Sequence, residues 1–288
     1  MAISKKIAVL LVYASDGIPA PNRPDPAFYT DLFLNDSESL NRYWIDASDG
    51  AVDLAGTQVF GWRSHGLKQA NFVALDRLAK IKQAVAAFTT NADEQHRIDL
   101  SGFDSVAVFG DPANDLGSNG VKLFNLPTGD KWLGTSIFDI RPNHAGVCHE
   151  VGHGFGFDHS FDDSPTAIDP ADDARPGAYG DNWDVMSYSL CAMYAHPRFG
   201  NAGPTINATM RRIAGWLKPG RVIDGRAARL GRCTVYDTND PNPDHPHVVT
   251  VDEYDFEFRA RPWLEPCHRY GCPGSNDRGK WRHTLDAA

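Results

Sequence analysis

Histidines and a glutamate in the segment from His149 to His159 have the spacing of a catalytic metal site. His149 and His153 stand at positions i and i+4, so on a helix they share one face and can direct two imidazole nitrogens at one ion. Glu150 follows His149 directly, which places its carboxylate beside the ion rather than on it. A carboxylate in that position can take a proton from a water that the metal has acidified.

His159 is the third candidate ligand, and it requires the chain to leave the helix first. The next position on the face of His149 and His153 is Phe157, which cannot bind a metal. Gly156 supplies the exit, because glycine at a helix C-terminus adopts the left-handed conformation without a clash of a Cβ atom. Three protein nitrogens leave one tetrahedral position for water, and this open coordination is typical of catalytic Zn²⁺.

The pattern H-E-x-x-H-x-x-G-x-x-H resembles the signature of the metzincin zinc peptidases. That family carries a methionine turn downstream, and the segment 184–188, Asp-Val-Met-Ser-Tyr, is similar to it. The resemblance implies that Met186 packs below the three imidazoles. It also implies that Tyr188 reaches the metal and stabilises the oxyanion, as the corresponding tyrosine does in astacin-like and serralysin-like members.

Further segments resemble the gametolysin and immune-inhibitor branch of secreted microbial metzincin-like peptidases. Ser160 after the third histidine, and the segments 39–56 and 203–217, carry that similarity. The resemblance extends over about residues 7–218. It suggests a secreted protein, although the chain itself leaves the localisation unknown.

The residues and the resemblance together predict a zinc metalloendopeptidase that acts on a protein or peptide substrate. Glu150 is the expected general base, and Tyr188 is the expected donor to the oxyanion. One alternative is a zinc hydrolase that cleaves a non-peptide amide by the same chemistry. Another is a zinc-bearing, non-catalytic module that binds a peptide or glycan, although such a module has no need of Glu150.

Charge and hydropathy exclude two classes of partner. The 288 residues carry a formal net charge of −9 without a cluster of Lys and Arg, which argues against a nucleic-acid partner. The chain contains no run of about 18 apolar residues, so we expect no membrane span. We expect a monomer.

The segment 158–184 is rich in aspartate, and Arg175 is its only Lys or Arg. Aspartate favours turns, so the segment reads as a solvated loop. Aspartate oxygens in an irregular loop also suit Ca²⁺, but the Asp-x-Asp-x-Asp-Gly spacing is missing. Zn²⁺ is therefore the main cofactor predicted, with Ca²⁺ as a secondary possibility.

Five cysteines stand at no zinc-finger spacing, so they imply no disulfide framework. Cys267 and Cys272 are close enough in sequence to pair. Cys148 adjoins His149 but faces another side of the helix, so we expect it to be buried rather than to bind the metal.

Alternation of strands and helices predicts an α/β (α+β) fold with a twisted, mostly parallel sheet. The run 7–12 reads as a buried first strand, although basic residues ahead of it also resemble the start of a signal peptide. Strands are expected at 52–62 and 104–109, and a long helix at 72–88.

The resemblance adds an antiparallel edge strand that pairs with substrate, a role that suits Gly134 to Ser136 by position. The metal helix is expected at about residues 143–155. We expect a metzincin-like catalytic domain at 1–218, with its cleft between an upper part, 1–158, and a lower part, 159–218. Residues 219–288 are expected to form a small β-rich C-terminal region.

Overall fold

A computed structural model describes most of the chain. The described residues are 2–17, 23–90, 97–162, 175–226, 232–238, 240, 242, 244–252, 254–259 and 283–286. Cys267 and Cys272, whose pairing was suggested by their spacing, lie outside them, as does the middle of the aspartate-rich segment. Among these residues, no helix combines the length and the apolar character that crossing a bilayer needs.

The central element is a five-stranded mixed sheet with the strand order β4-β2-β5-β7-β6. Its strands, in that order, are β4 (Gln58–Ser64), β2 (Ile7–Tyr13), β5 (Ser105–Asp111), β7 (Gly129–Asp139) and β6 (Gly117–Leu126). Neighbours are parallel from β4 to β7, whereas β6 is antiparallel to β7 and forms one edge. The mixed α/β class predicted from the sequence is confirmed.

The two inner strands β2 and β5 are buried on both faces, which explains why their sequences are almost continuously apolar. Ala8, Leu10 and Val12 belong to one core cluster, while Ile7, Val9 and Leu11 belong to another. Successive side chains of a strand point to opposite faces, so these two sets face different layers. The run 7–12 is therefore a strand buried within the sheet, as its apolar sequence predicted.

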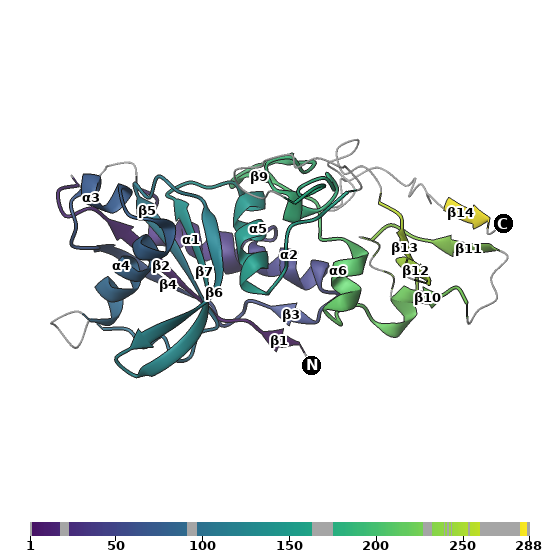
Figure 1. Cartoon of the computed structure of the whole chain (residues 1–288), viewed down its shortest axis with the longest axis horizontal. Helices are drawn as coiled ribbons and strands as arrows, with labels where there is room; N and C mark the ends of the chain where they lie inside the picture. The colour runs from purple at the N-terminus through teal and green to yellow at the C-terminus, as the bar shows by residue number, and fades with distance from the viewer. Residues whose placement is uncertain are drawn as a thin grey trace.

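Helices form the layers on either face of the sheet. The first core cluster includes residues of α4 (Arg77–Thr89), and the second includes residues of α2 (Leu40–Ala47) and α5 (His144–Gly154). The remaining helices are α1 (Pro26–Thr30) with the π-helix η1 (Asp31–Asn35), α3 (Gln69–Val73), α6 (Ala208–Ile213), and the 3-10 turns η3 (Val185–Ser187) and η4 (Pro219–Arg221). In Figure 1, α5 and α2 lie between the large sheet and the C-terminal strands.

Two predicted elements are each divided in the structure. The apolar stripe at 72–88 forms α3 and α4, because the Asp76 side chain accepts a hydrogen bond from Ala79 N and starts a new helix there. The segment 52–62 contains β3 (Val52–Asp53), which pairs with β1 (Ile3–Ser4), followed by a turn and then β4. Apolar periodicity located both segments, but it does not record a capping hydrogen bond such as that of Asp76.

The assignment of Gly134 to Ser136 to the edge strand is wrong. These residues lie in β7 and pair with β5 on one side and with β6 on the other. Their backbone groups are therefore occupied within the sheet, and the antiparallel edge strand is β6. The error arose because the two strands form a hairpin, whose halves have similar Gly-rich, alternating sequences.

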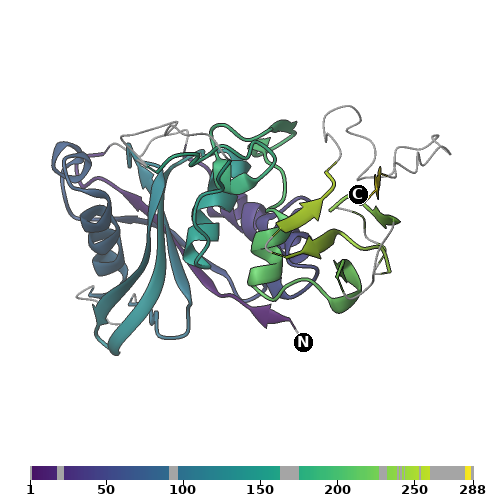
Figure 2. The ribbon, with the colours of Figure 1, turned by 45° about the vertical axis from the view of Figure 1, so that its right-hand side comes forward.

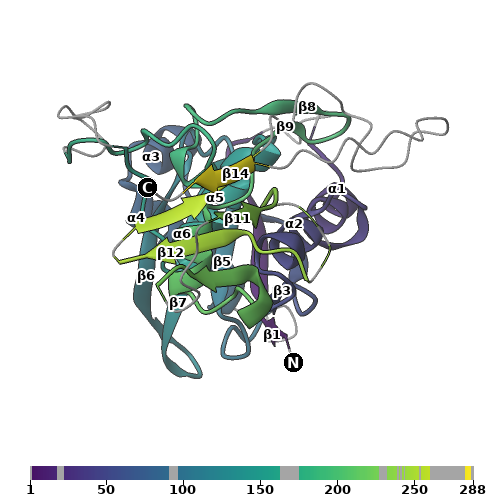
Figure 3. The same cartoon turned by 90° about the vertical axis from the view of Figure 1, so that its right-hand side faces the viewer.

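The C-terminal part contains two small sheets. One has the order β10 (Val222–Asp224), β12 (Val248–Val251) and β13 (Tyr254–Glu257), and the other pairs β11 (Arg232–Val235) with β14 (His283–Asp286). They lie on the far side of α5 from the large sheet (Figure 2), and β12 and β13 lie in front of α6 in the end view (Figure 3). Glu257 accepts a hydrogen bond from Ala208 N at 2.7 Å, which ties β13 to the start of α6.

A further pair of strands, β8 (Tyr194–His196) and β9 (Gly200–Ala202), forms an antiparallel hairpin beside the beginning of α5. His144, the first residue of α5, donates its backbone N–H to Phe199 O at 2.9 Å. The hairpin thus satisfies one of the backbone groups that a helix leaves unpaired at its start.

Trp44 packs against α5, the helix that carries His149 and His153. This fully buried side chain of α2 packs against Phe155, with ring centroids 4.8 Å apart, and against Phe157 and Trp216. A Cβ atom at Gly152 would lie 3.4 Å from the Trp44 ring, so α5 rests closely on it. The aromatic cluster therefore fixes the end of α5, where the chain turns toward His159.

We expect Trp44→Ala to lower the free energy of unfolding by about 3–5 kcal/mol, because a large core side chain is lost and a cavity remains. Trp132→Ala is the matched control, since Trp132 is 63% exposed and its loss should cost about 0.5 kcal/mol or less. Urea denaturation of the metal-free protein measures both. Equal costs for the two substitutions would contradict the buried position of Trp44.

Candidate metal centre

The helix α5 carries two of the candidate ligands and is buried over most of its length. Glycines allow other elements to approach it closely. A Cβ atom at Gly152 would lie 2.6 Å from Met186 Sδ, and one at Gly146 would lie 3.0 Å from the Tyr188 ring. The turn that contains Met186 and Tyr188 therefore lies directly against α5.

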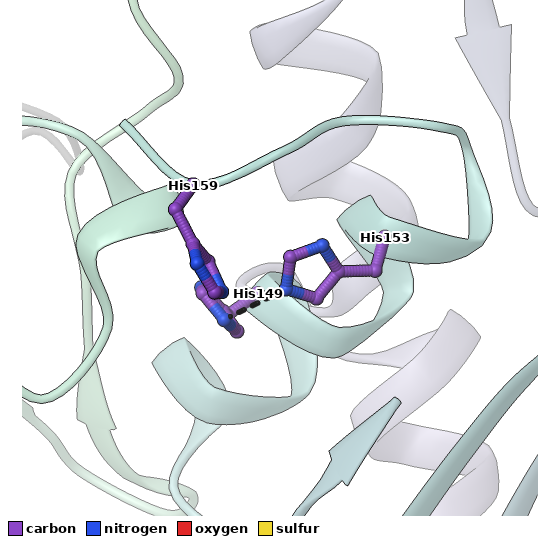
Figure 4. Close-up of side chains that lie close together, drawn as sticks. All are labelled: His149, His153 and His159. Carbon is purple, nitrogen blue, oxygen red and sulfur yellow. Dashed lines mark hydrogen bonds between the residues drawn. The ribbon is translucent and has the colours of Figure 1, made fainter. Parts of the chain in front are cut away.

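The three histidines of the motif lie together in the structure. One ligand atom from each of His149, His153 and His159 is within 4.8 Å of the others (Figure 4). Within the described residues, no other group of His, Cys, Asp or Glu meets that criterion. The structure thus brings together the predicted ligands, although they come from a helix and from the loop that follows it.

Backbone carbonyls determine how two of these rings are oriented. His149 Nδ1 is 3.0 Å from Val185 O, and His153 Nδ1 is 2.8 Å from Phe157 O. A carbonyl oxygen only accepts, so each Nδ1 must carry the proton and donate. Each Nε2 then presents a lone pair, which is the arrangement that outer hydrogen bonds give to histidines that bind metals.

The separation of these two lone pairs fits a shared cation. His149 Nε2 and His153 Nε2 are 3.1 Å apart. Neither can donate to the other while both protons sit on Nδ1, so the two nitrogens repel unless a positive charge lies between them. Two nitrogens at about 2.0–2.1 Å from one tetrahedral zinc lie about 3.4 Å apart, close to the observed distance.

Burial keeps His149 in the form that binds metals. Desolvation, followed by the neighbouring His153, lowers the pKa of His149 to about 3. Its imidazole is therefore neutral at pH 7, and a metal has no proton to displace from its Nε2. The donor set of three imidazoles can accept a divalent metal.

The loop after α5 brings His159 back to the other two histidines. Gly156 has φ of +94°, in the left-handed region, and its N–H donates to His153 O at 3.0 Å. Phe157 N donates to Gly152 O at 3.1 Å, which satisfies a further carbonyl at the end of the helix. The reversal directs Phe157 toward the Trp44 cluster and leaves His159 beside the metal-binding face.

The turn η3 carries Met186 beneath the site, and its side chain is fully buried. The carbonyl that orients His149 belongs to Val185, the residue before it. Met186 Sδ occupies the space that a side chain at Gly152 would fill. The turn therefore positions the site through one hydrogen bond and one packing contact.

Asp184 is a buried carboxylate that sequence reasoning did not single out. It accepts hydrogen bonds from Met186 N at 2.7 Å and from Asn207 N at 2.9 Å. Full burial raises the pKa of Asp184 to about 6. This side chain joins the methionine turn to the start of α6, and Ser160 N, in the loop after His159, donates to Met186 O at 3.3 Å. Only the folded chain brings these segments together.

Glu150 and Tyr188, the predicted catalytic residues, differ in their surroundings. Glu150 lies on α5 next to His149 and is 4% exposed. Tyr188 is half-buried, with its ring centroid 5.9 Å from that of His149, and Asn143 Nδ2 donates to its hydroxyl at 3.4 Å. Tyr188 thus lies over the first turn of α5, beside His149.

Tyr179 is a residue near the site that sequence reasoning missed. Its hydroxyl oxygen is 2.8 Å from His159 Nε2, and the two rings are 3.9 Å apart. Its segment, Gly177 to Gly180, contains two glycines, and that spacing marks a constrained turn. The pattern could have suggested an unusual backbone there but not its contact with His159.

The described part of the aspartate-rich segment is held by protein partners. Asp158 forms an ion pair with Arg175 at 2.9 Å, and Asp181 pairs with Arg259 at 3.3 Å. Residues 163–174, which hold several of its aspartates, lie outside the described part of the chain. A Ca²⁺ site in this segment stays a prediction.

No family model matches this chain, and no curated protein is detectably similar to it.

We expect one Zn²⁺ per chain to bind to the metal-free protein, with His153→Ala weakening binding at least about 100-fold, since loss of an outer-shell partner alone often costs 10- to 100-fold. His245→Ala is the matched control, because His245 pairs with Asp240 away from the three histidines. Competition with a chromophoric chelator measures the affinity. Equal affinity in the two variants would exclude the three-histidine centre.

Buried histidines also predict loss of stability in acid. Burial, then the nearby His196, lowers the pKa of His144 to about 3, so the unfolded chain binds a proton there below about pH 6.5 while the folded chain does not. Stability therefore falls as the pH drops from 6.5 toward 3. At pH 5 the cost is about 2 kcal/mol for this one histidine.

The corresponding experiment compares metal-free wild type with His144→Gln, which cannot be protonated. Urea denaturation at pH 7.5 and pH 5.0 should show a loss of stability that is smaller by about 2 kcal/mol in the variant. The same loss in both proteins would show that His144 is protonated in the folded state.

Proposed function

We propose that this protein is a zinc-dependent endopeptidase. The observation that carries the proposal is the convergence of three imidazoles, two of them with Nε2 lone pairs 3.1 Å apart, beside the buried carboxylate of Glu150. This set combines the open coordination of a catalytic zinc site with an adjacent general base. The further assignment to the metzincins rests on the motif and on the methionine turn.

A divalent zinc held by His149, His153 and His159 would act as a Lewis acid toward a carbonyl group and would acidify a water. Glu150 takes the proton from that water and then delivers it to the leaving amine. Its low exposure keeps the carboxylate away from bulk solvent, where competing proton exchange would be fast. Tyr188 is the proposed donor to the oxyanion.

The edge strand β6 supports a peptide as the substrate. It is antiparallel to β7, and its other side is the end of the sheet. The strand packs against α5 together with β7, so the edge runs beside the helix that carries Glu150. An extended peptide can pair with such an edge through its backbone, which would present successive peptide bonds to the site.

The support for the metzincin assignment comes from several separate features. Met186 packs against the metal helix under the histidines, and Val185 beside it orients His149. The sheet has an antiparallel edge strand before α5, although it is β6 and not the segment Gly134 to Ser136. These features come from three separate segments of the chain. A chance match of the histidine motif alone would not account for all of them.

We expect Glu150→Gln to bind Zn²⁺ as wild type does and to cleave peptides about 10²- to 10⁴-fold more slowly, because the ligands remain while the base is lost. A peptide-library digest, with and without a chelator, measures cleavage, and metal analysis of the same samples measures binding. Asp46→Asn, an exposed carboxylate-to-amide change on α2, is the matched control.

The outcomes separate the proposed function from its alternatives. Chelator-sensitive cleavage by wild type and by Asp46→Asn, but not by Glu150→Gln, supports the peptidase. Zinc binding with no cleavage of any peptide would favour a binding module or a hydrolase of another amide. Cleavage by Glu150→Gln at the wild-type rate would exclude Glu150 as the base.

A further inference from the structure

Tyr179 lies against the metal-binding histidines from a segment that the motif does not include. Its hydroxyl oxygen is 2.8 Å from His159 Nε2, and its ring lies 3.9 Å from that of His159. The ring is also 6.3 Å from that of His149, at an angle of 22°. The phenol ring thus lies directly against His159 and farther from His149.

The backbone around Tyr179 is held in place by the strand segment that follows His159. Asp162 N donates to Gly177 O at 3.0 Å, and Phe161 forms an antiparallel bridge with Ala178. A Cβ atom at Gly180 would collide with the Asp162 carboxylate, so a side chain there would require Asp162 to move. These contacts fix the position of the Tyr179 segment relative to the loop that carries His159.

Tyr179 has φ of +62°, an unusual value for a residue with a large side chain. Such backbone strain persists only where surrounding contacts impose it, and it is concentrated at functional sites. The side chain is 7% exposed, so the strained backbone places a phenol in the interior of the protein rather than in solvent. The placement next to His159 is the consequence of that strain.

The distance from the Tyr179 hydroxyl to His159 Nε2 has the same magnitude as the distance between the two helical imidazole nitrogens, 2.8 Å against 3.1 Å. Two ligands at about 2.0–2.1 Å from one ion lie about 2.9 Å apart at a right angle and about 3.4 Å apart at the tetrahedral angle. Both observed separations are close to this range. The Tyr179–His159 separation suits a hydrogen bond in the absence of a metal, and it also suits two neighbouring ligands on one cation.

We infer that Tyr179 is a fourth protein ligand of the metal, in addition to His149, His153 and His159, so that the catalytic water would take a fifth coordination position. The inference rests on the metal centre of the proposed function. On coordination the phenol O–H bond breaks, the oxygen forms a bond to the cation, and the proton passes to solvent. Tyr188, whose hydroxyl accepts from Asn143, stays free of the metal and available to a substrate oxyanion.

The test compares Tyr179→Phe with Tyr188→Phe in the full chain after removal of metal. Zn²⁺ titration against a chromophoric chelator should show affinity about 10- to 100-fold lower in Tyr179→Phe and within about twofold of wild type in Tyr188→Phe. Titration with Cu²⁺ should give a phenolate-to-copper charge-transfer absorption in wild type and Tyr188→Phe. The absorption should be lost in Tyr179→Phe.

The possible results distinguish this inference from the metal centre itself. Unchanged or tighter zinc binding in Tyr179→Phe would overturn the inference, because the hydroxyl would then only hydrogen-bond to His159. Loss of the absorption in Tyr188→Phe instead, or its absence in wild type, would also overturn it. If His153→Ala binds zinc as well as wild type, the metal centre fails as well. Thermal unfolding of each metal-free variant establishes that it folds.

Discussion

The site depends on two hydrogen bonds from imidazoles to backbone carbonyls, His149 Nδ1 to Val185 O and His153 Nδ1 to Phe157 O. They fix the tautomer of each ring and leave both Nε2 lone pairs facing one point. The first bond joins the helix to the methionine turn, and the second joins the helix to the loop that returns toward His159. An unpaired polar group in a buried site costs roughly 1–3 kcal/mol, so hydrogen bonds to the polar groups around the histidines contribute to the stability of the site.

This cost accounts for the hydrogen bonds made by Asp184, a buried carboxylate near the histidines. Ser160 N, in the loop after His159, donates to Met186 O at 3.3 Å. Asp184 is fully buried, and its oxygens accept from two backbone N–H groups, Met186 N and Asn207 N. Replacing a carboxylate there with an apolar group would leave those donors without partners in a region that excludes water. The methionine turn, the His159 loop and the start of α6 therefore keep a common geometry, and the apolar contact of Met186 with Gly152 completes it.

Periodicity in the sequence predicted the class of fold well and its boundaries less well. The buried strands β2 and β5 and the helix α5 occur where the apolar patterns indicated. The stripe at 72–88 became two helices because Asp76 starts a new one, a local hydrogen bond that apolar spacing does not record. The edge strand was assigned to the wrong half of a hairpin. Its two strands have similar alternating sequences, and they differ in that β7 also pairs with β5 whereas β6 does not.

The sequence by itself predicted the cluster of three histidines, because residues four apart on a helix and a glycine exit follow from local backbone geometry. It also determined the adjacency of Glu150 to His149, which is a property of the chain. Only the tertiary structure decided which groups orient the histidine rings and which other side chains contact them. Val185, Asp184 and Tyr179 lie far from the motif in sequence, and their positions follow from packing and from the strained turn at Tyr179. Contacts between distant segments depend on the whole fold, so no local pattern can specify them.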